Sequence, residues 1–215
     1  MTVRLSMAIA LLLLVAGCGS MRTNPDAPQS AGGLVPTVED QDVGLVGIAP
    51  DFDLKAYSVI GVALFPVTDR LGDEGDRRFA AEMASFFQTE LVRRLRVSGL
   101  FPRVVNLTET AFTPAPGEKV LRLEGNITRL GRGSQAARYF AGIFGAGQTR
   151  AQADMRFVEA ADGRAVMVVA DRRIASIGLF GGADRDHLRE SFDDMARDLA
   201  KFLQRLARGE APRKE

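Results

Sequence analysis

The chain has 215 residues, with 28 Lys and Arg against 27 Asp and Glu, and it contains one cysteine and one histidine. This balance argues against a general nucleic-acid binder and against a polybasic patch for membrane surfaces, because both need a basic surplus. A single cysteine rules out internal disulfides, and together with a single histidine it rules out thiolate or histidine metal clusters. We therefore expect no metal, no cofactor and no nucleic-acid partner, and the length suggests one domain with a tether.

The N-terminal stretch predicts export and lipidation. Arg4 precedes the apolar run that ends at Cys18, and this run has roughly ten residues, about half of what a membrane-spanning helix needs. The sequence Val15-Ala16-Gly17-Cys18 looks like a bacterial lipobox, so residues 1–17 are expected to be a signal peptide and Cys18 the acylated new N-terminus. The alternative is a chance cysteine behind an ordinary secretory signal. Gly19, in place of an aspartate, favours the periplasmic face of the outer membrane.

The next segment, residues 18–53, is predicted to be a flexible tether. It is rich in Pro, Gly, Asn, Asp and Ser and has no sustained hydrophobic periodicity. A chain of about 35 flexible residues has a root-mean-square reach of roughly 30–35 Å. The stretch Val43–Ile48 is the exception and could form an edge strand. A single globular domain is expected over residues 54–208, and residues 209–215 are expected to be a disordered tail.

The first half of this domain predicts a strand, a helix and a second strand. The apolar run Tyr57–Phe65 is typical of a central strand. A helix is predicted over Arg77–Val97, with Asp76 as the N-cap and Gly99 just past its C-terminus. A short strand, Arg103–Val105, follows and is expected to pair in parallel with the first.

The second half predicts three antiparallel strands. Val120–Leu130 and Gln148–Val158 alternate between apolar and polar residues, so each strand should have one buried face and one solvated, charged face. Asp162-Gly163 is a strong hairpin signal, and Arg164–Ile177 is expected to be the third strand.

The last element is the most regular. A helix is predicted over Asp186–Ala207, and its apolar residues recur at spacings of four and three, which favours a core-facing helix over a coiled-coil seam. These residues are Leu188, Phe192, Met195, Leu199, Phe202 and Leu206. The predicted fold is therefore α/β (α+β): a mixed sheet of about five strands, β-α-β and then antiparallel β-β-β, with two main helices packed on the sheet.

Two glycine-rich stretches, residues 131–147 and 177–182, place aromatic residues among glycines. Neither contains a nucleotide-binding loop. In one interpretation their apolar side chains cap the end of the core. In the other they form an exposed surface that docks onto a partner or a membrane, because the first stretch is longer than a hairpin requires. The candidate docking residues are Arg138, Tyr139, Phe140, Ile143, Phe144, Leu179 and Phe180.

Several of these motifs resemble a family of uncharacterised bacterial lipoproteins that carry the domain of unknown function DUF4410. The matching features are Leu123–Ile127, Gly131–Gly133, Arg138-Tyr139, Gly145–Gly147, Asp162-Gly163 and Gly178–Gly182. The resemblance implies a compact α/β domain of the cell envelope and no established activity.

Three functions compete at this point. The favoured one is a non-enzymatic accessory or scaffolding lipoprotein of the envelope, which binds an envelope protein or a second copy of itself. The second is a carrier or sensor of an apolar ligand such as a lipid. The third is a hydrolase, for which Glu124 and Asp154 on neighbouring strands, or His187 at the start of the last helix, are the only candidates. No catalytic, cofactor-binding or metal residues are expected.

Overall fold

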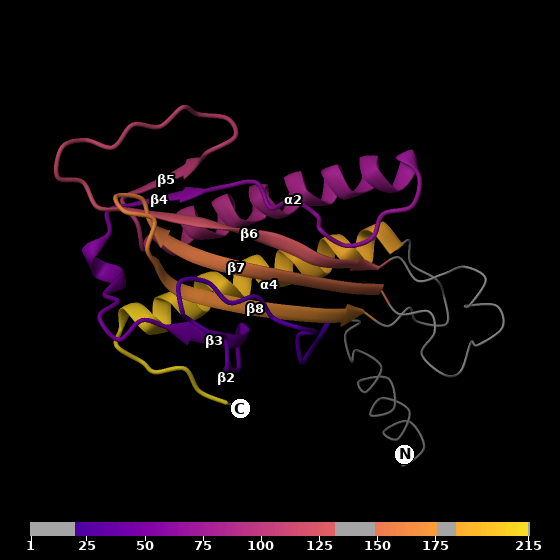
Figure 1. Cartoon of the computed structure of the whole chain (residues 1–215), viewed down its shortest axis with the longest axis horizontal. Helices are drawn as coiled ribbons and strands as arrows, with labels where there is room; N and C mark the ends of the chain where they lie inside the picture. Colours follow the sequence, from indigo (N-terminus) through magenta and orange to yellow (C-terminus); the bar gives the residue numbers. More distant parts are fainter. Residues whose placement is uncertain (1–19, 132–148, 176–183, 215) are drawn as a thin grey trace, which may run out of the picture.

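The computed structural model describes residues 20–131, 149–175 and 184–214, and Figure 1 shows the arrangement of their helices and strands. Eight strands of this part of the chain form one mixed sheet. The strands are β1 (Met21–Thr23), β2 (Val38–Asp40), β3 (Gly44–Ile48), β4 (Val59–Val62), β5 (Arg103–Asn106), β6 (Val120–Gly131), β7 (Thr149–Glu159) and β8 (Ala165–Ala175). The helices are α2 (Glu74–Ser98) and α4 (Asp184–Ala207), with a 3-10 turn, η1 (Leu54–Ala56), before β4.

The sheet has the order β2-β3-β8-β7-β6-β4-β5, and β1 pairs with β8 beside β3. The predicted α/β (α+β) class is confirmed. β4 runs parallel to β5, and β6, β7 and β8 are antiparallel, as expected. β4 also runs parallel to β6, a pairing that the sequence analysis did not predict. The sheet is larger than the predicted five strands because three short strands come from the segment before residue 54.

Helix α2 begins earlier than its apolar pattern predicts. Asp73, not Asp76, is the N-cap, and its carboxylate accepts the backbone N–H of Asp76 at 2.9 Å. The charged first turn, Glu74 to Asp76, carries no apolar signal but is stabilised by the positive end of the helix dipole. Gly99 adopts the left-handed conformation with φ 67° and ends the helix as predicted.

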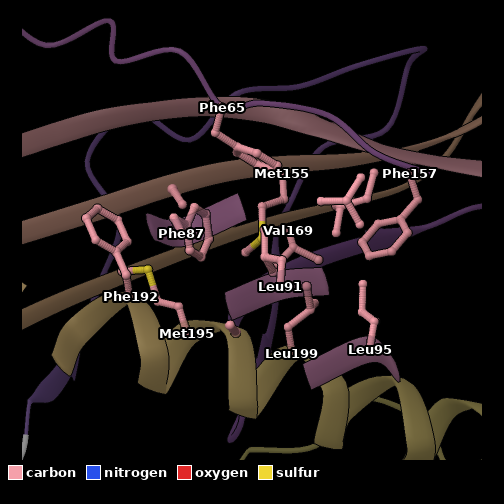
Figure 2. Packing of buried hydrophobic residues seen from close by; sticks show 14 of the residues in the cluster. Phe65, Phe87, Leu91, Leu95, Met155, Phe157, Val169, Phe192, Met195 and Leu199 are labelled. Atoms are coloured by element: carbon pink, nitrogen blue, oxygen red, sulfur yellow. The ribbon is translucent and has the colours of Figure 1, made fainter. Parts of the chain in front are cut away.

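Both helices pack on one face of the sheet and build the core there (Figure 2). The ring of Phe87 on α2 lies 5.2 Å from Phe65 of the sheet layer and 5.0 Å from Phe192 on α4, so these three rings join the three elements. The predicted apolar stripe of α4 is confirmed, since Leu188, Phe192, Met195, Leu199 and Phe202 are buried.

The segment predicted to be a flexible tether is folded onto the domain from residue 20 onward. β3 lies between β2 and β8, with Leu45 opposite Ala170, and β1 pairs with the other half of the same edge of β8, with Met21 opposite Ile174. The expectation of a tether over residues 18–53 therefore does not hold for residues 20–53, which we call the N-terminal segment. Strands of three to five residues are too short to show a period in the sequence. Most of the predicted stretch Val43–Ile48 does form a strand, β3 (Gly44–Ile48), which is covered by β2 and is not at the edge.

The tail after α4 is also held on the sheet. The backbone N–H of Gln41 donates to the carbonyl of Arg213 at 2.8 Å, and the backbone N–H of Arg213 donates to the Asp40 carboxylate at 3.0 Å. The predicted disordered tail is thus wrong for residues 209–214, because two backbone groups of Arg213 have partners beside β2.

Candidate functional site

A cluster of eight charged side chains joins the N-terminal segment, β8 and α4. We call it the ionic cluster. It contains four cations and four anions: Arg22, Asp40, Asp42, Asp171, Arg173, Asp198, Lys201 and Arg205. Asp40 and Asp171 have fully buried side chains, and Arg173 and Arg205 are only 4% exposed. Buried charges are rare unless each has a partner, so these four side chains depend on the ion pairs they form, whereas Lys201 is 60% exposed.

Arg205 of α4 forms the first half of the cluster. One of its terminal nitrogens lies 2.6 and 2.7 Å from the two carboxylate oxygens of Asp40, and its Nε lies 2.7 Å from Asp42. The second oxygen of Asp42 accepts from Lys201 at 2.8 Å. One helix therefore holds both aspartates of the β2–β3 turn through directed, charge-assisted hydrogen bonds.

Arg173 of β8 forms the second half. Its guanidinium donates to Asp171 at 2.9 Å and to Asp198 of α4 at 3.0 Å. Arg22 of β1 approaches the same Asp198 at 3.2 Å and also donates to the backbone carbonyls of Gln41 and Asp42. Arg22 thus binds β1 to α4 and to the β2–β3 turn at once.

Local periodicity explains how these residues meet. Asp171 and Arg173 have the same parity along β8 as Met167 and Val169, so they continue the core-facing side of the strand. On α4, the residues Asp194, Asp198, Lys201 and Arg205 repeat the 4-3-4 spacing of the apolar stripe, one position before it. A charged stripe beside an apolar one was a usable signal that the sequence analysis missed.

Electrostatics in the cluster favour the charged forms. Burial by itself would raise the pKa of Asp42, but the hydrogen bond from Lys201 and the charge of Arg205 outweigh it and lower that pKa. Burial would likewise lower the pKa of Arg173, and the charge of Asp171 outweighs it and raises that pKa. Asp42 and Arg173 are therefore held in their charged forms, and the formal charges of the four cations and four anions cancel.

The N-terminal segment starts beside this cluster. The hydroxyl of Ser20 donates to the carboxylate of Asp194 on α4 at 2.6 Å. A cleft of about 660 Å³ lies here, and its lining includes Ser20, Arg22, Asp198 and Lys201. The first described residue of the chain is thereby fixed on the folded domain, two positions after Cys18.

A second contact holds the N-terminal segment on the outer face of the sheet. Gln152 of β7 accepts from the backbone N–H of Asp26 at 2.8 Å and donates to the Asp26 carbonyl at 2.9 Å. Asp154 lies beside it and accepts from Thr128 at 2.7 Å. The predicted solvated face is therefore wrong at these positions, because Gln152 and Asp154 are 0% and 3% exposed.

The two carboxylates weighed for a hydrolase have opposite surroundings. Glu124 pairs with Arg122 and Arg156, and although burial opposes it, these arginines lower its pKa. Burial raises the pKa of Asp154, and the hydrogen bonds from Thr128 and Gln152 only partly offset it. Each group therefore has its own partners, arginines for Glu124 and the side chains of Thr128 and Gln152 for Asp154.

The other candidates from the sequence divide into two groups. The side chain of His187 is 16% exposed in the first turn of α4, with Nδ1 3.8 Å from Glu190. Cys18 and the docking candidates Arg138, Tyr139, Phe140, Ile143, Phe144, Leu179 and Phe180 lie outside the described residues. Within the described ranges, no group of three or more His, Cys, Asp or Glu residues is arranged to hold a metal ion, and no helix has the length and apolarity to cross a bilayer.

The described residues that flank these candidates in the sequence nevertheless lie together at one end of the sheet. Gly131 pairs with Arg150, Arg150 with Ile174, and Ile174 with Met21. We call this the Met21 end of the sheet. The chain leaves it toward Cys18, toward residues 132–148 and toward residues 176–183, whereas the β7–β8 hairpin lies at the opposite end of these strands (Figure 1).

Comparison with known sequences places this fold in a family. The model of the domain of unknown function DUF4410 matches residues 63–178, more than half of the chain. The chain belongs to this DUF4410 family. The match runs from the end of β4 through β8, and it includes Asp171 and Arg173 but none of the other six members of the ionic cluster. No curated protein matches the sequence.

Solved structures with a related arrangement have low sequence identity. A PelC dodecamer from Paraburkholderia phytofirmans is 9% identical, with a TM-score of 0.43 over 72% of this chain and 94% of that one. A DUF330 protein from Xanthomonas campestris is 11% identical, with a TM-score of 0.45 over 81% and 95%. A candidate lipoprotein from Caulobacter crescentus is 15% identical, with a TM-score of 0.37 over 74% and 96%.

Replacing Arg205 with methionine tests the ionic cluster. Methionine keeps an unbranched apolar stem but leaves Asp40 and Asp42 without their main partner, and uncompensated buried charge of this kind costs about 3–5 kcal/mol. We expect Arg205→Met to lower the free energy of unfolding by that amount in urea denaturation. The matched control is Arg208→Met, whose arginine is 60% exposed and, among the described residues, forms an ion pair only with Glu210. Its exposed pair is worth about 0–1 kcal/mol, and equal losses in both variants would contradict the role of the cluster.

The pKa shifts of Asp154 and Glu124 have opposite signs, so the two residues predict opposite pH dependences of folding stability. The pKa of Asp154 is raised in the folded state, so the wild type should gain stability relative to Asp154→Asn as the pH falls from 7 toward about 4. The pKa of Glu124 is lowered, so the wild type should lose stability relative to Glu124→Gln as the pH falls below about 4.3. Urea denaturation over this pH range measures both differences, and trends of the same sign would contradict the burial of Asp154.

Proposed function

We propose that this protein is a non-enzymatic accessory lipoprotein of the bacterial cell envelope, anchored through Cys18 to the periplasmic face of the outer membrane. In this role the domain presents a surface to another envelope protein, or to a second copy of itself, close to the membrane. The membrane is reached through the lipid on Cys18, and nucleic acid is not a partner.

The observation that carries this proposal is the position of Ser20. The lipobox sequence before Cys18 supports an acylated N-terminus, and Ser20 is hydrogen-bonded to Asp194 of α4 only two residues later. Together, two or three acyl chains hold a protein on a membrane durably, whereas one chain gives marginal binding. A domain fixed so close to such an anchor works at the membrane surface.

The docking candidates support a partner at the same place. Tyr139, Phe140, Phe144 and Phe180 belong to segments whose described ends are at the Met21 end of the sheet, beside the start of the N-terminal segment. Aromatic side chains are enriched at protein interfaces. A partner that binds them is therefore expected in, or on, the membrane that holds the anchor.

The arrangement of charges supports an accessory role over catalysis. The carboxylates considered for a hydrolase are bound by arginines in the case of Glu124 and by Thr128 and Gln152 in the case of Asp154. The cleft of about 660 Å³ is lined largely by polar and charged residues, including Arg22, Asp42 and Lys201. Sites for apolar ligands are lined mainly by apolar side chains, so this cleft does not favour the lipid-carrier alternative.

In-cell cross-linking tests the proposal. A photoreactive amino acid is placed at Phe144 in the full chain, in both a Cys18 and a Cys18→Ser background, and the matched control position is Asp162 at the hairpin end. We expect the Cys18 chain to sediment with the outer membrane and to give a discrete adduct from Phe144 and none from Asp162. The Cys18→Ser chain cannot be acylated, so it should no longer sediment with the outer membrane and should lose the adduct.

Two results would contradict separate parts of the proposal. An unmodified Cys18 in the mass spectrum of the mature chain would contradict the proposed lipid anchor. Identical adducts from Phe144 and Asp162, or none from either position in a correctly anchored chain, would contradict the proposed docking surface.

A further inference from the structure

The fold restricts how the domain can stand on its membrane. A fully extended chain spans at most about 3.6 Å per residue, so the Cα atom of Ser20 lies within about 7 Å of that of Cys18. This reach is far shorter than the roughly 30–35 Å of a flexible tether of the predicted length. The orientation of the domain at the membrane therefore depends on how firmly the first residues after Gly19 are held.

Several separate hydrogen bonds, ion pairs and strand contacts hold these residues. Ser20 donates to Asp194, and Arg22 is bound to Asp171, Asp198 and the backbone of the β2–β3 turn. β1 also pairs with β8 over three residues, from Met21 to Thr23. An exposed single contact would be worth little, but these contacts include partners that are fully or nearly buried.

The register of the sheet shows which end of the domain is close to the anchor. Met21, Ile174, Arg150 and Gly131 follow one another across four strands at the Met21 end. The hairpin at Asp162 is separated from it by the 11 residues of β7, a length of about 33 Å at the rise of a strand. This is longer than the reach available between Cys18 and Ser20, so the two ends cannot exchange places while the N-terminal segment stays bound.

We propose that the Met21 end of the sheet sits directly against the phospholipid headgroups of the leaflet that holds the acyl chains, with the hairpin end pointing away from the membrane. This rests on the proposed lipidation of Cys18. The side chains at this end suit such a surface, because Met21 is 69% exposed and Arg150 and Arg197 are also exposed, with Arg197 close to Ser20 through their shared partner Asp194. An apolar residue among arginines matches a boundary between acyl chains and phosphate groups.

Fluorescence quenching by lipids tests this orientation. Cys18 is the only cysteine, and its sulfur is blocked when it is acylated, so an introduced cysteine is the only free thiol. The full-length acylated protein, with Arg150→Cys or Asp162→Cys labelled by an environment-sensitive dye, is placed in vesicles of phosphatidylethanolamine and phosphatidylglycerol whose headgroups carry nitroxide quenchers. We expect the dye at position 150 to lose most of its fluorescence and the dye at position 162 to keep it.

A spacer variant provides the control for the short reach. A flexible glycine–serine insertion of about 15 residues between Gly19 and Ser20 adds a root-mean-square reach of roughly 20 Å. We expect this variant to float with the vesicles as the wild type does, but to lose the quenching at position 150.

The outcomes separate this inference from the proposed function. Flotation without quenching at position 150, quenching at both positions, or quenching at position 162 alone would each overturn the orientation while leaving the anchor intact. Failure to float, with an unmodified Cys18 in the mass spectrum, would overturn the lipidation itself.

Discussion

The interaction on which the rest of the structure depends is the set of buried ion pairs between α4 and the strands next to it. Arg205 holds Asp40 and Asp42, and Arg173 holds Asp171 and Asp198. Four cations and four anions cancel, and each of the buried members Asp40, Asp171, Arg173 and Arg205 has a partner of opposite charge. Buried ion pairs of this kind add little net stability over an apolar core, yet they penalise every arrangement in which one partner is missing. The cluster therefore fixes where the N-terminal segment lies.

This constraint bears directly on the proposed lipidation of Cys18. A lipoprotein domain at the end of a long flexible tether samples many orientations. In this protein the N-terminal segment is bound from Ser20 onward to α4, to β8 and to the outer face of β7. The Met21 end of the sheet is consequently close to Cys18, the residue proposed to be acylated, and the chain enters and leaves its glycine-rich stretches at that same end. In the proposed function, the register of one sheet places the membrane, the anchor and the candidate docking residues at the same end of the domain.

Much of the domain could be predicted from the sequence because long elements carry long patterns. The stripe from Leu188 to Phe202 gave the correct helix and face, and the alternation gave the faces of β6 up to Ile127, after which a register shift brings Leu130 into the core. The N-terminal segment could not be predicted in this way, since strands of three to five residues show no period. Asp154 was placed on a solvated face by parity alone, and only the fold shows that residue 26 covers its neighbour Gln152. The charges in β8 and α4 did carry a signal, because Asp171 and Arg173 occupy core-facing positions.

The central claim is that the N-terminal segment is an ordered part of the domain up to residue 20. Hydrogen exchange of the backbone amides tests it most directly, with Asp26 and Asp42 as reporters because their N–H groups donate to Gln152 and to Asp40. The account predicts that both amides exchange as slowly as those at the centre of β8, since all three are released by the same unfolding event. Exchange of Asp26 and Asp42 at the rate of an unstructured chain, with β8 still protected, would show that the segment is a free tether and would contradict the account.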